Sequence, residues 1–228
     1  ILANFDVKLD GLIVASPSNP TGSMLSAEAL EEIVQWCDAN GVRLISDEIY
    51  HGITYDGKAS TALSYGDNAI IINSFSKYFS MTGWRLGWMI VPENMIRAAE
   101  CLAQNLYISP PTLSQLATIS VFECFKELDA NVARYAENRA LLLKELPKAG
   151  LDQLAPSDGA FYVYADVTRF TNDSQAFCQK VLAETGVAIT PGIDFDTERG
   201  SQFVRFSFAG ATADMAAATE RLGDYLAK

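Results

Sequence analysis

The sequence has 228 residues, 49% of them hydrophobic, so it can bury a core as one large domain or as two modest ones. Its 17 basic and 28 acidic residues give a net charge of -11, which argues against a nucleic-acid surface and against attraction to anionic lipid. No apolar run approaches the roughly 18 residues that a membrane span needs. We therefore expect a small-molecule ligand, with neither nucleic acid nor membrane as a partner.

The cysteines and the single histidine argue against a metal site. Four cysteines are spread along the chain without a C-x-x-C pair, and His51 is the one histidine that could join them. Cysteines at such spacings indicate a reducing compartment, so a cytoplasmic location is expected. The opening residues 1–8 lack the pattern of a signal peptide and read as the middle of a domain. We therefore expect a fragment of a longer chain.

The first half of the chain alternates buried strands with helical and loop segments. The apolar runs at 12–15, 42–47 and 69–73 predict strands. Ser26 and Gly41 are placed as the N-cap and the C-terminal stop of a helix between the first two strands. This order indicates parallel pairing in an α/β sheet.

Polar residues follow the ends of all three predicted strands. Asn19 comes after the first strand, Asp47 and Tyr50 after the second, and Lys77 after the third. In parallel sheets, ligands bind outside the carboxyl ends of the strands. The sequence therefore predicts that these four side chains are aimed at one edge of the sheet.

The second half of the chain has a different organisation. The pattern is helical from residue 93 to residue 104, and the segment 107–111 interrupts it with two prolines. We place the domain boundary there, which divides the chain into residues 1–109 and residues 110–228. The second part reads as a compact α+β domain. We expect its helices at 112–127, 131–146, 174–184 and 212–227, and its strands at 160–165, 187–189 and 203–208.

The segment 70–91 places a lysine at the end of a buried strand. Ser74 and Ser76 precede Lys77, and Arg85 follows it eight residues later, which predicts an anion site beside an amine nucleophile. The chain lacks both the G-x-G-x-x-G fingerprint and the G-x-x-x-x-G-K-[ST] pattern. A dinucleotide site and a P-loop are therefore not supported.

Each candidate residue has an ordinary structural explanation when it is taken alone. Asn19 precedes a proline and reads as a turn former, and Asp47 at a strand end is more often a helix cap or a surface acid. Arg205 lies in an alternating strand, where it would usually face solvent or form a salt bridge, and most lysines such as Lys77 are solvated charges. The combination of these residues is more informative than its members.

Four short motifs occur in order along the chain. They are Ser-Asn-Pro-Thr-Gly, Ser-Asp-Glu-Ile-Tyr, Ser-Phe-Ser-Lys with Gly-Trp-Arg-Leu-Gly, and Phe-Val-Arg-Phe-Ser. This series closely resembles the fold-type I pyridoxal-phosphate enzymes, specifically the class I/II aminotransferases of the aspartate aminotransferase family. The resemblance implies part of a large, mainly parallel-sheet cofactor domain at 1–109 and a small C-terminal α+β domain at 110–228. It also implies a homodimer for the full-length protein.

The resemblance implies a role for each residue around the cofactor ring. Lys77 matches the lysine that forms a Schiff base with the cofactor aldehyde, and Asp47 matches the acid that pairs with the pyridine nitrogen. Asn19 and Tyr50 match the residues that hydrogen-bond the 3′ oxygen. Pyridoxal phosphate is an electron sink only while its ring nitrogen is protonated, and a carboxylate beside that nitrogen keeps it so. The implied catalytic residues are Lys77, Asp47 and Tyr50.

The remaining matches concern the two anions. Ser74, Ser76 and Arg85 match residues that hold the 5′ phosphate, and Arg205, together with Asn19, matches residues that bind the α-carboxylate of the substrate. The planar fork of arginine suits both anions because it can donate two hydrogen bonds to each. The carboxylate is common to all α-amino acids, so the substrate side chain is left open.

The implied activity is a ping-pong transamination between an α-amino acid and a 2-oxo acid by a Schiff-base mechanism. Two alternatives remain at this point: a carbon-sulfur β-lyase of the same fold, and an aminotransferase-like sensor domain that binds the cofactor without turnover. Family chains begin well upstream of the strand before Asn19. We therefore expect weak cofactor binding, little activity and an open sheet edge if the chain truly begins at residue 1.

Overall fold

The computed structural model describes residues 8–227, which divide into two compact units. The first unit runs up to Pro17 and continues over Leu25–Asp129, and the second contains Ser18–Met24 and the chain from Ala130 onward. The segment 110–129 thus groups with the first unit, whereas the sequence analysis assigned it to the small domain. Its packing gives the reason, because Val121 and Leu128 are buried in a cluster with Met81.

The short segment Ser18–Met24 belongs to the second unit because its backbone is bonded there. The Gly159 amide donates to the Gly22 carbonyl at 2.9 Å, and the Met24 amide donates to a carboxylate oxygen of Asp158 at 3.2 Å. Gly22 has a φ of +69°, and a Cβ on it would lie 2.9 Å from the Tyr162 carbonyl oxygen. This turn therefore requires glycine.

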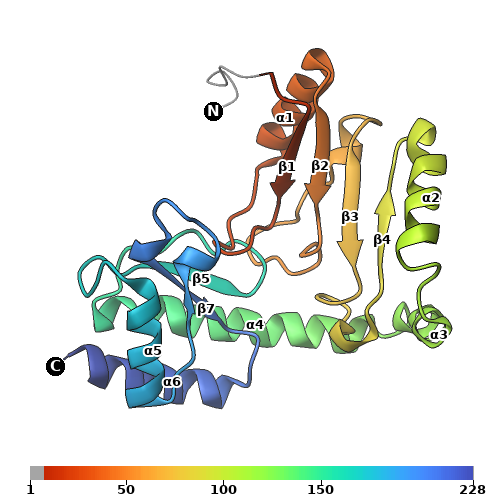
Figure 1. The fold of residues 1–228 in the computed structure, drawn as a ribbon. Coiled ribbons are helices and arrows are strands. Elements are labelled where there is room, and N and C mark those ends of the chain that lie inside the picture. The colour runs from red at the N-terminus through yellow and green to blue at the C-terminus, as the bar shows by residue number, and fades with distance from the viewer. Residues whose placement is uncertain (1–7, 228) are drawn as a thin grey trace. The chain divides into compact units, whose positions relative to one another are not determined.

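The sheet of the first unit has the order β1-β2-β3-β4, with bounds Gly11–Ala15, Arg43–Asp47, Ile70–Ser74 and Gly87–Ile90 (Figure 1). The first three strands pair in parallel, and β4 pairs with β3 in the antiparallel direction. The prediction of parallel strands in an α/β sheet is confirmed, with strand ends within a residue or two of those expected.

Helix α1 (Ala27–Asn40) connects β1 to β2, as its termini predict. The Ser26 hydroxyl caps the first turn by accepting from the Ala29 amide, and Gly41 ends the helix with a φ of 64°. One apolar stripe of the helix packs against the sheet and excludes water from it. The buried members of this core are Leu30, Val34, Cys37, Val42, Leu44, Ala62, Ala69 and Ile71.

Three helices follow β4, and one break between them is not where the sequence placed it. They are α2 (Ile96–Leu106), α3 (Thr112–Val121) and α4 (Phe125–Glu145). The sequence predicted a break between residues 127 and 131, and this prediction was wrong. The chain turns at 122–124, a segment without the glycine or proline that would have predicted a turn. Leu128 lies inside α4 and is buried, so its packing keeps that turn helical.

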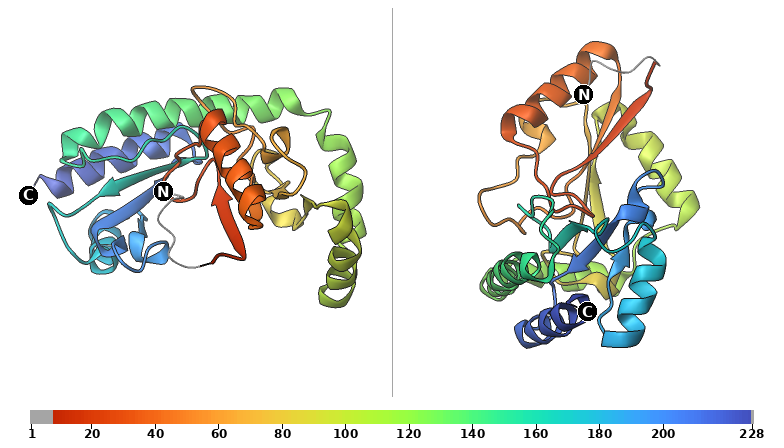
Figure 2. Two further views of the ribbon diagram at one scale, coloured as in Figure 1. Left: turned by 90° about the horizontal axis from the view of Figure 1, so that it is seen from above. Right: turned by 90° about the vertical axis from the view of Figure 1, so that its left-hand side faces the viewer.

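The second unit contains a three-stranded sheet of order β5-β7-β6, antiparallel throughout, with bounds Tyr162–Asp166, Phe203–Ser207 and Thr190–Pro191. The prediction of a strand at 187–189 was wrong, because the pairing begins one residue later, where Thr190 lies opposite Arg205. Helices α5 (Ser174–Thr185) and α6 (Thr212–Leu226) pack against each other (Figure 2). Fully buried side chains fill this core: Val163, Val167, Val181, Val204, Phe208 and Leu222.

Among residues 8–227, no helix combines the length and the apolar character that crossing a bilayer requires.

Candidate active site

Asp47 is the last residue of β2, and its backbone is fixed on both sides. The Ser16 amide donates to the Asp47 carbonyl at 3.1 Å, and the Glu48 amide donates to the Ile72 carbonyl of β3 at 2.9 Å. The side-chain Oδ1 accepts from the Ile49 amide at 3.1 Å. This carboxylate is therefore held at the carboxyl end of the sheet, with acceptor capacity left over for a ligand.

Lys77 and Tyr50 lie close together in the first unit. Tyr50 is 4% exposed, and the Lys77 Nζ lies 5.6 Å from the centroid of its ring. Lys77 occupies the turn after β3, which is closed by hydrogen bonds from Ser80 to Lys77 and from Met81 to Phe75. The fold thus brings together two predicted site residues that are 27 positions apart in the sequence.

Ser74 and Ser76 form a compact pair after β3. Their hydroxyl oxygens lie 2.9 Å apart, and the Ser76 amide donates to Ser74 Oγ at 3.0 Å. Ser74 pairs with Gly87 across the β3–β4 hairpin, which places Arg85 at the same end of the sheet. Arg85 is exposed, has a φ of 52° and donates from Nη1 to the Thr82 carbonyl at 2.9 Å. Hydroxyl, amide and guanidinium donors suited to an anion therefore gather at this edge.

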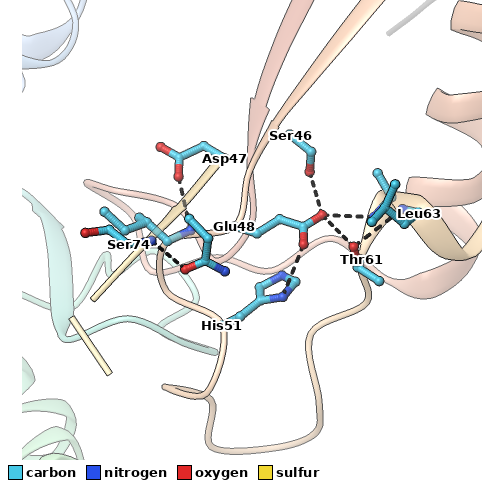
Figure 3. A network of polar contacts seen from close by, with 10 residues as sticks. Ser46, Asp47, Glu48, His51, Thr61, Leu63 and Ser74 are labelled. Atoms are coloured by element: carbon cyan, nitrogen blue, oxygen red, sulfur yellow. Dashed lines mark hydrogen bonds and ion pairs between the residues drawn. The ribbon is translucent and has the colours of Figure 1, made fainter. Parts of the chain in front are cut away.

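A buried carboxylate next to Asp47 organises the loop around it (Figure 3). Glu48 is 3% exposed, and its Oε1 accepts from Ser46 Oγ at 3.0 Å, from Thr61 Oγ1 at 3.1 Å and from the Ala62 amide at 2.9 Å. These bonds tie the residue after β2 to the segment 61–62. In the sequence Glu48 is only the glutamate of the Ser-Asp-Glu-Ile-Tyr motif, because no local pattern predicts that Thr61 donates a hydrogen bond to it.

His51 completes this network from the other side of Glu48. Its Nδ1 lies 3.4 Å from Glu48 Oε2, and burial lowers the pKa of His51 below its usual range, against the opposing effects of the Glu48 carboxylate and the Ser16 backbone. Asp47 and Tyr50 thus sit in a loop that a buried polar cluster holds in shape.

Asn19 and Arg205 meet in the second unit. Arg205 Nη1 donates to Asn19 Oδ1 at 2.6 Å, and Nη2 lies 3.4 Å from Thr190 Oγ1. Both of these polar contacts are with uncharged groups, so they leave the guanidinium charge available. Asn19 was predicted both beside the residues that follow β2 and β3 and together with Arg205 at the substrate carboxylate. The structure pairs Asn19 with Arg205, and its contacts with the cofactor ring and with a substrate stay predictions.

The donor set of the first unit fits pyridoxal phosphate. Two hydroxyls and a guanidinium, from Ser74, Ser76 and Arg85, suit a phosphate. The carboxylate of Asp47 suits a protonated ring nitrogen, and the amine of Lys77 suits an aldehyde. Among the described residues, no cluster of histidine, cysteine and carboxylate side chains is arranged to hold a metal ion.

A family model described as aminotransferase class I and II matches residues 2–222, which is nearly the whole chain. The chain belongs to this aminotransferase family. Members of the family depend on pyridoxal phosphate, which agrees with the donor set at the end of the first sheet. The resemblance seen in the four sequence motifs is thereby confirmed.

Two curated aminotransferases illustrate the similarity. The valine–pyruvate aminotransferase of Mycobacterium tuberculosis is 56% identical over 230 residues, covering 99% of this chain and 59% of that protein. The (5-formylfuran-3-yl)methyl phosphate transaminase of Methanocaldococcus jannaschii is 36% identical over 226 residues, covering 97% of this chain and 59% of that protein. The chain therefore spans somewhat more than half of the length of these aminotransferases.

A solved structure gives the same result for the fold. The crystal structure of an aminotransferase from Mycobacterium tuberculosis superimposes with a TM-score of 0.96 at 56% identity, covering 99% of this chain and 59% of that one. The α/β fold class predicted from the sequence is therefore confirmed.

Proposed function

We propose that the protein containing this chain is a pyridoxal-phosphate-dependent aminotransferase that moves an amino group between an α-amino acid and a 2-oxo acid. The observation that supports this most directly is the place of Lys77, in the turn after β3, with its amine over the Tyr50 ring. When bound, the cofactor supplies an electron sink for the bonding electrons released at the amino-acid Cα. Within this proposal the functional boundary stays where the sequence predicts it, with cofactor binding up to residue 109 and the small domain from residue 110, although the segment 110–129 packs with the first unit.

Three residues of the chain have separate roles in the proposed reaction. Asp47 stabilises positive charge on the cofactor ring nitrogen, and Arg205 binds the α-carboxylate through its planar fork. Lys77 takes the proton from the Cα of the amino acid and returns a proton to the carbon that receives the amino group. Binding both the cofactor and the substrate lowers the entropic cost of bringing the reacting groups together.

Valine and pyruvate are the first donor and acceptor to test. The 56% identity to a protein named valine–pyruvate aminotransferase supports this pair. The relative from Methanocaldococcus jannaschii, at 36% identity, is named for a furan phosphate, so the family serves different side chains. The products expected from valine and pyruvate are 3-methyl-2-oxobutanoate and alanine, which conserves both carbon skeletons and the amino group.

A homodimer in the cytoplasm is part of the same proposal. Helices α2 and α3 and the segment after α2 expose large apolar side chains, as contact surfaces between proteins do. The most exposed of these apolar residues are Leu102, Leu106, Ile108, Leu113 and Ile119, at 63% to 81%. The cytoplasmic location is supported by the four cysteines, which are all unpaired, as in a reducing compartment. The mass of the full-length protein in solution tests the dimer.

One experiment tests the chemistry. The full-length protein is incubated with pyridoxal phosphate, reduced with borohydride and digested, and the modified lysine is identified by mass spectrometry. We expect the adduct on Lys77, alanine formation from valine and pyruvate, and loss of both in Lys77→Ala. The matched control is Lys58→Ala, at an exposed lysine of the first unit, which should leave both unchanged. An adduct on a different lysine would refute the assignment.

A further inference from the structure

The guanidinium of Arg205 lies over two aromatic rings. Its Cζ is 4.3 Å from the centroid of the Tyr162 ring and 4.7 Å from that of Phe195. The Arg205 Nε is buried, and within the described part of the chain it has no hydrogen-bond partner. The faces of aromatic rings attract a cation at such distances, so the two rings compensate for the missing hydrogen bond.

Tyr162 has a fixed position in the second unit. It belongs to β5, is 5% exposed and lies opposite Ser207 on β7, the strand that carries Arg205. The Ser157 hydroxyl, itself buried, donates to the Tyr162 carbonyl at 2.7 Å. The ring is therefore held by the sheet and does not depend on a ligand for its position.

Phe195 lies in a loop that backbone hydrogen bonds hold closed. Its amide donates to the Gly192 carbonyl at 2.9 Å, and the Gly200 amide donates to the Asp196 carbonyl at 2.9 Å. The Ser174 hydroxyl, fully buried, donates to the Gly200 carbonyl at 2.9 Å. A Cβ on Gly200 would lie 2.3 Å from the Gly192 carbonyl oxygen, so the two ends of the loop touch backbone to backbone. The backbone of the loop that carries the Phe195 ring is therefore fixed.

Rings orient a guanidinium without competing for its hydrogen-bond donors. An acidic neighbour would also fix the side chain, but it would occupy the donors and neutralise the charge that a substrate carboxylate needs. The neighbours of Arg205 avoid this conflict. Asn19 and Thr190 contact the Nη atoms as neutral groups, and the two rings contact the guanidinium without accepting its N–H hydrogen bonds in the way a carboxylate would.

We propose that Phe195 and Tyr162 are positioning residues that hold Arg205 ready for the α-carboxylate of the substrate. The proposal rests on the proposed function of Arg205. An arginine that is ordered before binding loses less conformational freedom when the carboxylate arrives, which strengthens binding without any new contact. This role of Phe195 has no signal in the sequence, because the residue is an ordinary aromatic in a loop, ten positions before Arg205.

The first test compares variants of the full-length, cofactor-loaded protein. Phe195→Leu removes the ring, Phe195→Tyr keeps it, and Phe170→Leu is the matched control. Phe170 is also half-buried and lies beside an arginine, with the Arg169 Cζ 5.9 Å from its ring centroid. We expect Phe195→Leu to raise the KM for valine roughly three- to thirtyfold with kcat within about twofold. The other two variants should match the wild type.

The second test separates positioning from a general structural role. Valinamide has the side chain and amine of valine but no carboxylate, so the loss in kcat/KM for Phe195→Leu should appear with valine and not with valinamide. Equal losses for both substrates, or no loss for either, would overturn the proposal. Circular dichroism and the melting temperature establish that the variant is folded, and Phe195→Tyr shows whether an aromatic ring restores binding.

A binding measurement makes the proposal independent of turnover. 3-Methylbutanoate keeps the carboxylate and side chain of valine but has no amine to react, and calorimetry gives its dissociation constant. We expect Phe195→Leu to weaken its binding by the same three- to thirtyfold factor, roughly. Unchanged binding, or no binding to the wild type, contradicts the inference. Failure of the proposed function would show separately, as no lysine adduct and no transamination by the wild type.

Discussion

The side-chain oxygen of Asn19 accepts a hydrogen bond of 2.6 Å from the guanidinium of Arg205, although 186 positions separate the two residues in the chain. The bond joins the turn that follows Pro17 to the middle of β7. Because an amide is neutral, it orients the guanidinium and leaves its positive charge unpaired. The contact therefore suits an arginine that has to bind a further anion.

Asn19→Asp should convert this neutral contact into an ion pair. The variant is nearly isosteric, but its carboxylate competes with the substrate carboxylate for the same guanidinium. We expect the KM of the full-length protein for its amino acid to rise at least about tenfold, which corresponds to roughly 1.4 kcal/mol. Asn94→Asp, at an exposed position before α2, is the control for adding one negative charge. A similar KM change in both variants would contradict the explanation.

Glu48→Ala should destabilise the protein strongly. The Thr61 hydroxyl and the Ala62 amide lose a charged acceptor in a buried site, and such losses cost about 2–4 kcal/mol. Denaturant unfolding of the variant measures the change. Glu31→Ala is the control, because Glu31 is exposed on α1 and accepts a hydrogen bond from the Gln35 side chain; its change should stay within about 0.5 kcal/mol.

The His51 imidazole should titrate below pH 6.5, roughly the ordinary histidine value, because burial lowers its pKa. Above that pH, His51 is neutral in the folded and unfolded states alike. Below it, His51 binds a proton in the unfolded chain but not in the folded chain. The free energy of unfolding therefore falls as the pH is lowered, until the pH passes the folded-state pKa of His51. NMR titration of the imidazole resonance, assigned by its loss in His51→Gln, measures the pKa. A pKa above 6.5 would mean that the Glu48 carboxylate outweighs burial.

Gly200→Ala should disrupt the loop that presents Phe195. The new Cβ would lie 2.3 Å from the Gly192 carbonyl oxygen, so the backbones must separate, at a cost of about 3 kcal/mol or more. Gly223→Ala is the matched control. A Cβ at Gly223, inside α6, meets nothing within 4 Å, and alanine favours the helix by about 0.5–1 kcal/mol. The two melting temperatures should therefore move in opposite directions.

Elements with strong local signals were predictable from the sequence. The three parallel strands are continuous apolar runs, and α1 has a capping serine at one end and a glycine at the other, so local chemistry defines them. The break between α3 and α4 was misplaced because residues 122–124 contain neither glycine nor proline. The short strand β6 was misplaced because pairing with β7, rather than local preference, decides where it lies.

The sequence by itself predicted which residues carry the chemistry. The spacing of Ser74, Ser76, Lys77 and Arg85 and the order of the four motifs were sufficient to indicate an amine beside an anion site and the aminotransferase family. These signals are local, because each motif combines a strand end with the turn that follows it.

Only the tertiary structure decided how these residues are supported. It brought Thr61 to Glu48 across 13 positions, and it brought the rings of Phe195 and Tyr162 and the amide of Asn19 to the Arg205 guanidinium. Such contacts depend on strand pairing and loop closure between segments that carry no common pattern. The order of residues along the chain therefore predicts which groups act, and the packing of distant segments decides which groups hold them in place.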